Sequence, residues 1–83
     1  MLFRCEVNIR PRPDILDPQG DAVGKALANL GFTGVGAVKV GRYLILEVEA
    51  DGPEAARQQV EDMCRKLLAN PITEDYELKV TAP

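Results

Sequence analysis

Two thiols are the most reactive side chains that this sequence offers for chemistry. The 83-residue chain contains no histidine, serine or tryptophan. It therefore lacks the commonest general base, the commonest hydroxyl nucleophile and the imidazole ligands of many metal sites. Cys5 falls on the apolar side of an alternating segment, and Cys64 falls beside the apolar stripe of an expected helix. Since no imidazole can activate them, we interpret both as buried hydrophobic residues.

The glycines at 31, 34 and 36 invite comparison with a phosphate-binding loop. Their order differs from a dinucleotide fingerprint, and they follow an expected helix instead of opening one. A helix cap and a turn explain them more simply. We therefore expect no catalytic, cofactor-binding or metal-binding residue in this chain.

Arginine is the other residue type that could form a site. Arg10 and Arg12 fall at and just after the end of an expected strand, and Arg42 falls in an expected turn. Bidentate guanidinium groups suit a carboxylate or another anion on a partner surface. The alternative is that all three are simply solvated.

The composition is that of a small globular domain. The chain carries a net charge of −3, with 46% hydrophobic and 28% charged residues. Its ten basic residues are scattered, which argues against a nucleic-acid surface. No apolar run approaches the roughly 20 residues of a membrane span, and no signal peptide is evident. We expect one cytoplasmic domain over residues 1–83, and its small size favours association with a partner or a second copy.

The first half of the chain predicts a strand followed by a helix. Apolar and polar residues alternate over residues 2–10, as in a half-buried strand. Asp17 and Pro18 form a helix start, because an N-cap carboxylate precedes a proline at the first helical position. Apolar residues then recur at helical spacing over residues 18–30, and Gly31 stands where a left-handed cap is expected.

The second half predicts three more strands and a helix. We expect a short strand over 35–40, a tight turn at Gly41 and Arg42, and a strand over 43–49. A second helix begins near Pro53 and ends at Asn70 and Pro71, and a last strand contains Tyr76 to Val80.

The predicted order is strand, helix, strand, strand, helix, strand. Four strands with one apolar face and two one-sided helices predict an α+β two-layer sandwich with an antiparallel four-stranded sheet, ferredoxin-like or a close variant. On its other face Tyr43 and Ile45 are more apolar than solvent requires, which favours a homodimer or a higher homo-oligomer using this sheet.

Five segments resemble the PurS family, in the right order and over nearly the whole chain. They are residues 15–20 (Ile-Leu-Asp-Pro-Gln-Gly), 30–32 (Leu-Gly-Phe), 38–43 (Val-Lys-Val-Gly-Arg-Tyr), 64–71 (Cys-Arg-Lys-Leu-Leu-Ala-Asn-Pro) and 74–76 (Glu-Asp-Tyr). PurS is the small subunit of phosphoribosylformylglycinamidine synthase. The turn that precedes Asp17 is longer here than is usual in the family and lacks its glycine.

The resemblance implies a non-catalytic subunit of a purine-synthesis enzyme. Its partners would be the ATP-dependent synthetase subunit PurL and the glutaminase subunit PurQ. The complex converts formylglycinamide ribonucleotide, glutamine and ATP into formylglycinamidine ribonucleotide, glutamate, ADP and phosphate. ATP, Mg and glutamine would be used by the partner subunits, and this chain would support assembly and ammonia transfer.

The resemblance also suggests which residues bind a partner. Asp17 has a structural explanation as a cap, whereas glycine in a first helical turn is unfavourable and capping does not need Gln19. We therefore interpret Gln19 and Gly20 as contacts of a partner side chain and backbone. The expected partner-binding residues are Arg10, Arg12, Asp17, Gln19, Gly20, Arg42 and Tyr43.

Two other functions fit the sequence less well. A dimeric ferredoxin-like domain that senses a small ligand would carry a glycine-bearing loop between the first strand and first helix, and residues 11–16 contain no glycine. An RNA-binding domain would need several aromatic side chains on the open sheet face. The assembly subunit is the function that the sequence favours.

Overall fold

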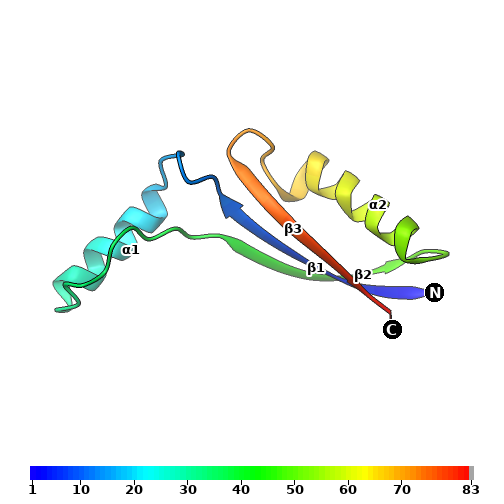
Figure 1. Ribbon diagram of the computed structural model, residues 1–83, viewed down its shortest axis with the longest axis horizontal. Coiled ribbons are helices and arrows are strands. Elements are labelled where there is room, and N and C mark those ends of the chain that lie inside the picture. The colour runs from blue at the N-terminus through cyan, green and yellow to red at the C-terminus, as the bar shows by residue number, and fades with distance from the viewer. Residues whose placement is uncertain (83) are drawn as a thin grey trace.

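Three strands and two α-helices make up the part of the chain that the computed structural model describes, residues 1–82. In chain order they are β1 (Leu2–Pro11), α1 (Pro18–Asn29), β2 (Arg42–Glu49), α2 (Pro53–Met63), a π-helical turn (Cys64–Leu68) and β3 (Glu74–Thr81). Figure 1 shows α2 over the sheet and α1 beyond its end. The predicted α+β class is confirmed.

β1 is the central strand, and its alternating sequence gives it one wholly apolar face. The sheet order is β2-β1-β3, and both pairings are antiparallel. Cys5, Val7 and Ile9 are completely buried on the face that α2 covers. Ala56 and Val60 of α2 are completely buried against them, so the core lies between this helix and the sheet.

The prediction of a four-stranded sheet is wrong. Residues 35–41 form no strand, and the chain runs from α1 directly into β2. A two-residue hairpin at Gly41 would need a positive φ there, and in residues 1–82 Gly31 is the one residue with a positive φ. Gly41 instead passes close to β1, because a Cβ at this position would lie 2.3 Å from the carbonyl oxygen of Ile9.

Both ends of α1 are capped as the sequence predicts. Asp17 is the N-cap and accepts a hydrogen bond from the Gly20 backbone N–H (3.0 Å), with Pro18 in the first turn. At the other end Gly31 has φ +98°. Its N–H bonds to the carbonyl of Ala28, and the Phe32 N–H bonds to the carbonyl of Leu27. These two bonds are the Schellman motif that a C-terminal glycine permits.

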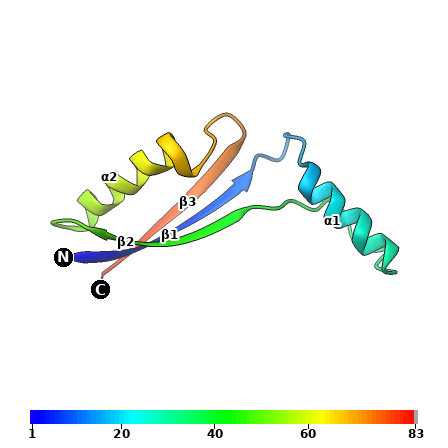
Figure 2. The same cartoon turned by 180° about the vertical axis from the view of Figure 1, so that it is seen from behind.

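The position of α1 differs from the prediction. Its apolar stripe was expected in the core, yet Val23 is 39% exposed and Leu30 is 72% exposed. Figures 1 and 2 show α1 projecting away from both the sheet and α2. The radius of gyration is 16.3 Å, against about 12 Å for a compact chain of this length. We call residues 12–41, which contain α1, the arm.

α2 does not end as a simple α-helix. It continues into the π-helical turn and stops before Asn70 and Pro71, as predicted. The turn leaves Leu67 83% exposed while Cys64 stays buried. Between Met1 and Ala82, no helix combines the length and the apolar character that crossing a membrane requires.

Candidate partner-binding surface

Most of the predicted partner-binding residues gather where the arm joins the sheet. Arg10 and Arg12 lie at the end of β1, and Arg42 begins β2 opposite Ile9. Asp17 lies at the start of α1 and accepts a hydrogen bond from the backbone of Val40. Residues 10–20 and 38–42 are therefore neighbours, and we call this region the elbow.

Asp17 holds the two ends of the arm together. One carboxylate oxygen accepts the Gly20 N–H, and the other accepts the Val40 N–H at 2.8 Å. The bond from Val40 and then the bond from Gly20 lower the pKa of Asp17 below its ordinary value. A further hydrogen bond joins the same two segments, because the Nζ of Lys39 donates to the carbonyl of Ile15 at 3.0 Å.

Gly20 has a structural explanation within its own chain. A Cβ at Gly20 would lie 2.1 Å from the carbonyl oxygen of Val38. The backbone that approaches this glycine is therefore that of the arm itself, which explains the glycine without a partner backbone. The predicted contact of Gly20 with a partner stays a prediction. Gln19 is exposed in the same helical turn, so its predicted contact with a partner stays a prediction.

The arginines of the elbow form ion pairs and hydrogen bonds with β3 and with the loop that precedes it. Arg10 forms an ion pair with Glu77 at 2.5 Å. Arg12 donates to the carbonyl of Pro71 at 2.7 Å and lies 3.2 Å from the carboxylate of Asp75. Both side chains remain about half exposed, so each guanidinium is oriented by this chain and still faces solvent.

Arg42 links the start of β2 to the loop before β3. It donates to the carbonyl of Leu68 at 2.7 Å and to the carboxylate of Glu74 at 2.9 Å. Glu74 also accepts the Asn70 N–H at 2.8 Å. The hydrogen bond from Arg42 is the main reason that the pKa of Glu74 lies below its ordinary value. The elbow is thus a preorganised charged surface.

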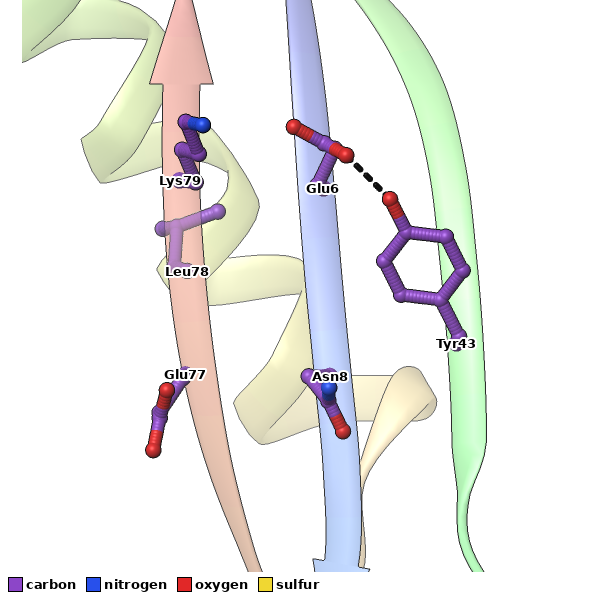
Figure 3. A pocket seen from close by; sticks show the side chains of 6 residues that line it. All are labelled: Glu6, Asn8, Tyr43, Glu77, Leu78 and Lys79. Atoms are coloured by element: carbon purple, nitrogen blue, oxygen red, sulfur yellow. Dashed lines mark hydrogen bonds between the residues drawn. The ribbon is translucent and has the colours of Figure 1, made fainter.

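Tyr43 lies apart from these contacts, on the face of the sheet that α2 leaves open. Figure 3 shows its hydroxyl donating to the carboxylate of Glu6, above a shallow depression that Lys79 helps to line. This bond lowers the pKa of Glu6 and raises the pKa of Tyr43. Tyr43 and Ile45 are 55% and 53% exposed, so the predicted apolar exposure on this face is confirmed.

The two thiols are buried in the core. Cys5 and Cys64 are both free and have no exposed surface. Burial raises the pKa of each thiol, which keeps both protonated at neutral pH. No group of three or more carboxylates and thiols in residues 1–82 is arranged to hold a metal ion.

The sequence reasoning missed the apolar surface of the arm. Leu16 is 77% exposed and Phe32 is 58% exposed, in addition to Leu30. The helical spacing of the stripe was visible in the sequence, but periodicity does not say whether an apolar face meets its own sheet or another molecule. Several large apolar side chains exposed on one segment are typical of an interaction surface.

Comparison with known proteins supplies the family. Residues 4–82 match the model of the PurS family, described as phosphoribosylformylglycinamidine (FGAM) synthase. The chain is 41% identical over 80 residues to the phosphoribosylformylglycinamidine synthase subunit PurS of Synechocystis, covering 96% of this chain and 80% of the relative. The corresponding subunit of Methanocaldococcus jannaschii is 37% identical, with 95% of each chain covered.

Solved structures indicate the same family. PurS of Bacillus subtilis superposes with a TM-score of 0.86 at 36% identity, covering 96% of this chain and 99% of that one. A chain in the structure of PurLQS from Thermotoga maritima superposes with a TM-score of 0.84 at 31% identity, covering 96% and 98%. The similarity includes the arm as well as the sheet, since nearly the whole of each chain is covered.

Proposed function

The chain belongs to the PurS family, and we propose that it acts as the non-catalytic small subunit of a phosphoribosylformylglycinamidine synthase in purine biosynthesis. The structural observation that supports this proposal is the exposed arm. It presents apolar side chains that its own sheet and α2 leave uncovered. An exposed apolar surface of this kind is typical of a site that another molecule covers.

The chemistry of the chain supports a role without catalysis. The sequence has no histidine or serine, and its two thiols are buried and protonated. Tyr43 has a raised pKa and donates its hydrogen bond to Glu6, so it is no ready base. Glutamine hydrolysis and ATP-dependent amidation therefore take place on other subunits. ATP, Mg and glutamine are bound there, and this chain binds none of them.

The partners we propose are the synthetase PurL and the glutaminase PurQ. A structure described as PurLQS of Thermotoga maritima contains a chain that superposes on this one over 96% of its length. The elbow offers these partners oriented guanidinium groups with half their surface exposed, at Arg10, Arg12 and Arg42. Bidentate donors of this kind suit carboxylates on a partner. In the assembly, this chain supports transfer of ammonia from glutaminase to synthetase.

We further propose that the arm packs on a second copy of the chain. Leu44 and Leu46 of β2 face the core side of the sheet and are half-buried, since α2 lies over β1 and β3. In a ferredoxin-like sandwich a second helix would cover this part of the sheet. The apolar stripe of α1 from a second copy can supply that layer, and a homodimer would complete the two-layer fold of a single domain, residues 1–83.

The test is assembly of the complex by gel filtration. The chain is mixed with synthetase and glutaminase subunits in the presence of glutamine and Mg-ADP. Gln19→Ala is the informative variant, because Gln19 is exposed and no hydrogen bond of its side chain is recorded within residues 1–82. Asn29→Ala, at the exposed far end of α1, is its control.

We expect the wild type and Asn29→Ala to co-elute with both partners and Gln19→Ala to elute separately. If the wild-type chain fails to co-elute under these conditions, the proposed function is wrong. If Gln19→Ala assembles as the wild type does, the elbow contact is wrong while the function stands.

A further inference from the structure

Two large apolar side chains are exposed where α2 leads into β3. Leu67 lies in the π-helical turn and is 83% exposed, and Ile72 lies in the loop that follows and is 77% exposed. Neither side chain belongs to the hydrophobic core. We call residues 64–73 the α2–β3 connection. Packing within residues 1–82 does not explain why these two positions are apolar.

The π-helical turn is the reason that Leu67 faces solvent. On an uninterrupted α-helix Leu67, seven residues after Val60, would lie in line with it on the buried side. The Ala69 N–H instead bonds to the carbonyl of Cys64, five residues back, at 3.1 Å. This wider turn places Leu68 against the core in place of Leu67. The exposure of Leu67 is therefore built into the helix, and single π-helical turns are frequent at functional sites.

Hydrogen bonds order the rest of the connection. Asn70 accepts the Ile72 N–H at its side-chain Oδ1 (3.0 Å) and the Thr73 N–H at its carbonyl (3.2 Å). Arg42 and Arg12 donate to backbone carbonyls on either side of Asn70. The connection is therefore preorganised, and it can present its apolar side chains at little entropic cost.

Cations surround the two apolar side chains. Arg65 and Lys66 directly precede the first of them, and Arg12 and Arg42 bind the backbone between them. Each arginine has a carboxylate partner in its own chain but stays about half exposed. Lys66 is exposed and forms no ion pair within residues 1–82. The connection thus carries surplus positive charge in a chain whose net charge is −3.

This charge pattern disfavours a second copy of the chain as the occupant. A symmetric contact between two copies places the same patch on both sides. The cations of one copy would then face the same cations of the other, which is unfavourable at an interface. A different surface that carries carboxylates avoids this repulsion and can accept the remaining N–H donors of the arginines.

We propose that the α2–β3 connection docks on another subunit of the synthase, with Leu67 and Ile72 in an apolar pocket that has carboxylates at its rim. The inference rests on the proposed function, because it needs the synthetase and glutaminase subunits as partners. Apolar anchors inside a polar rim are the usual anatomy of an interface in which a few residues supply most of the affinity.

The exposure of Leu67 is tested with its neighbour as the control. Leu67→Ala should leave the urea midpoint of the chain unchanged, whereas Leu68→Ala should lower it, because Leu68 packs against the core. A lower midpoint for Leu67→Ala would place Leu67 in the core and overturn the proposal.

Docking is measured by isothermal titration calorimetry. The full chain is titrated into an equimolar mixture of synthetase and glutaminase subunits, with glutamine and Mg-ADP present. Leu67→Ala and Ile72→Ala should each weaken binding by about tenfold. Leu2→Ala is the matched control and should bind as the wild type does, because Leu2 is also exposed but lies at the other end of β1.

The outcomes separate this site from the proposed function. Wild-type affinity for both Leu67→Ala and Ile72→Ala would overturn the docking site and leave the function intact, whereas no binding of the wild type would overturn both. Each variant alone should have the wild-type mass in sedimentation equilibrium. A lower mass would show that a second copy occupies the site and would contradict the proposal.

The carboxylate rim is tested by charge reversal. Lys66→Glu should weaken binding by about fivefold, and the loss should shrink as the salt concentration is raised. Lys25→Glu makes the same change of charge at an exposed position of α1 and should have a smaller effect. Equal losses for the two variants would show that no carboxylate faces Lys66, and the stated chemistry of the partner would be wrong.

Discussion

Gly20 lies against the backbone of Val38, so closely that a Cβ on Gly20 would be 2.1 Å from the Val38 carbonyl oxygen. This contact joins the first turn of α1 to the segment that returns to β2. Together with the hydrogen bonds of Asp17, it makes the arm one preorganised unit instead of a loose helix. A rigid arm can present its apolar stripe to another molecule at little entropic cost.

Gly20→Ala should destabilise the arm, because the new methyl group meets backbone that cannot move aside as a flexible side chain would. We expect a loss of about 1–3 kcal/mol in the free energy of unfolding. Gly34→Ala is the control, since nothing lies within 4 Å of a Cβ at Gly34. Urea denaturation of both variants checks this, and equal midpoints would contradict the proposed contact.

Asp17 should make the arm sensitive to acid. Its pKa is lower in the folded chain than in the unfolded one, because backbone N–H groups of Val40 and Gly20 bind the carboxylate. The stabilisation is therefore fully present above the unfolded pKa of about 3.9 and is lost as the pH falls through the folded pKa. A carboxyl-carbon NMR titration should show a midpoint for Asp17 below about 3.9, the ordinary value for an aspartate. A midpoint at or above that value would show that these two hydrogen bonds do not hold in solution.

Leu30→Lys should leave the fold of one chain intact but weaken its self-association. Leu30 is 72% exposed, so the free energy of unfolding of the isolated chain should change by less than about 0.5 kcal/mol. The apparent mass in gel filtration should fall toward that of a monomer. Asn29→Lys, at the exposed polar position that precedes Leu30, should leave the mass unchanged. An unchanged mass for Leu30→Lys would mean that the stripe is not an interface.

The thiols of the native chain should resist alkylation. Cys5 and Cys64 have no exposed surface, and burial raises the pKa of both. Modification by a thiol reagent at neutral pH should therefore follow unfolding and should reach both sites in denaturant. Rapid labelling of either thiol in the folded chain would contradict the non-catalytic assignment of these residues.

Local signals in the sequence predicted local structure well. Three such predictions are confirmed: the alternation in β1, the Asp17 cap and the Gly31 terminus of α1. Each depends only on residues that are close together in the sequence. Gly41 was misinterpreted because glycine serves both in tight turns and where two backbones approach closely. Only the position of Ile9, far away in the sequence, decides between these uses.

The site was harder to predict than the fold class. The role of Gly20 depends on Val38, and the contacts of Arg42 depend on Leu68 and Glu74. Such pairings follow from the tertiary arrangement and leave no periodic trace in the sequence. The stripe of α1 was correctly identified as apolar, but an apolar face meets whatever surface is available. In this chain its own sheet is out of reach.

The central claim is that this chain promotes a reaction to which it contributes no catalytic group. The most direct measurement is formylglycinamidine ribonucleotide synthesis by synthetase and glutaminase subunits as the chain is added. With glutamine as the nitrogen source, the rate should rise and then saturate at a fixed ratio of subunits. With free ammonia as the source, the rate should not depend on the chain, because no transfer between subunits is needed. A glutamine-dependent rate that is the same with and without the chain would contradict this account.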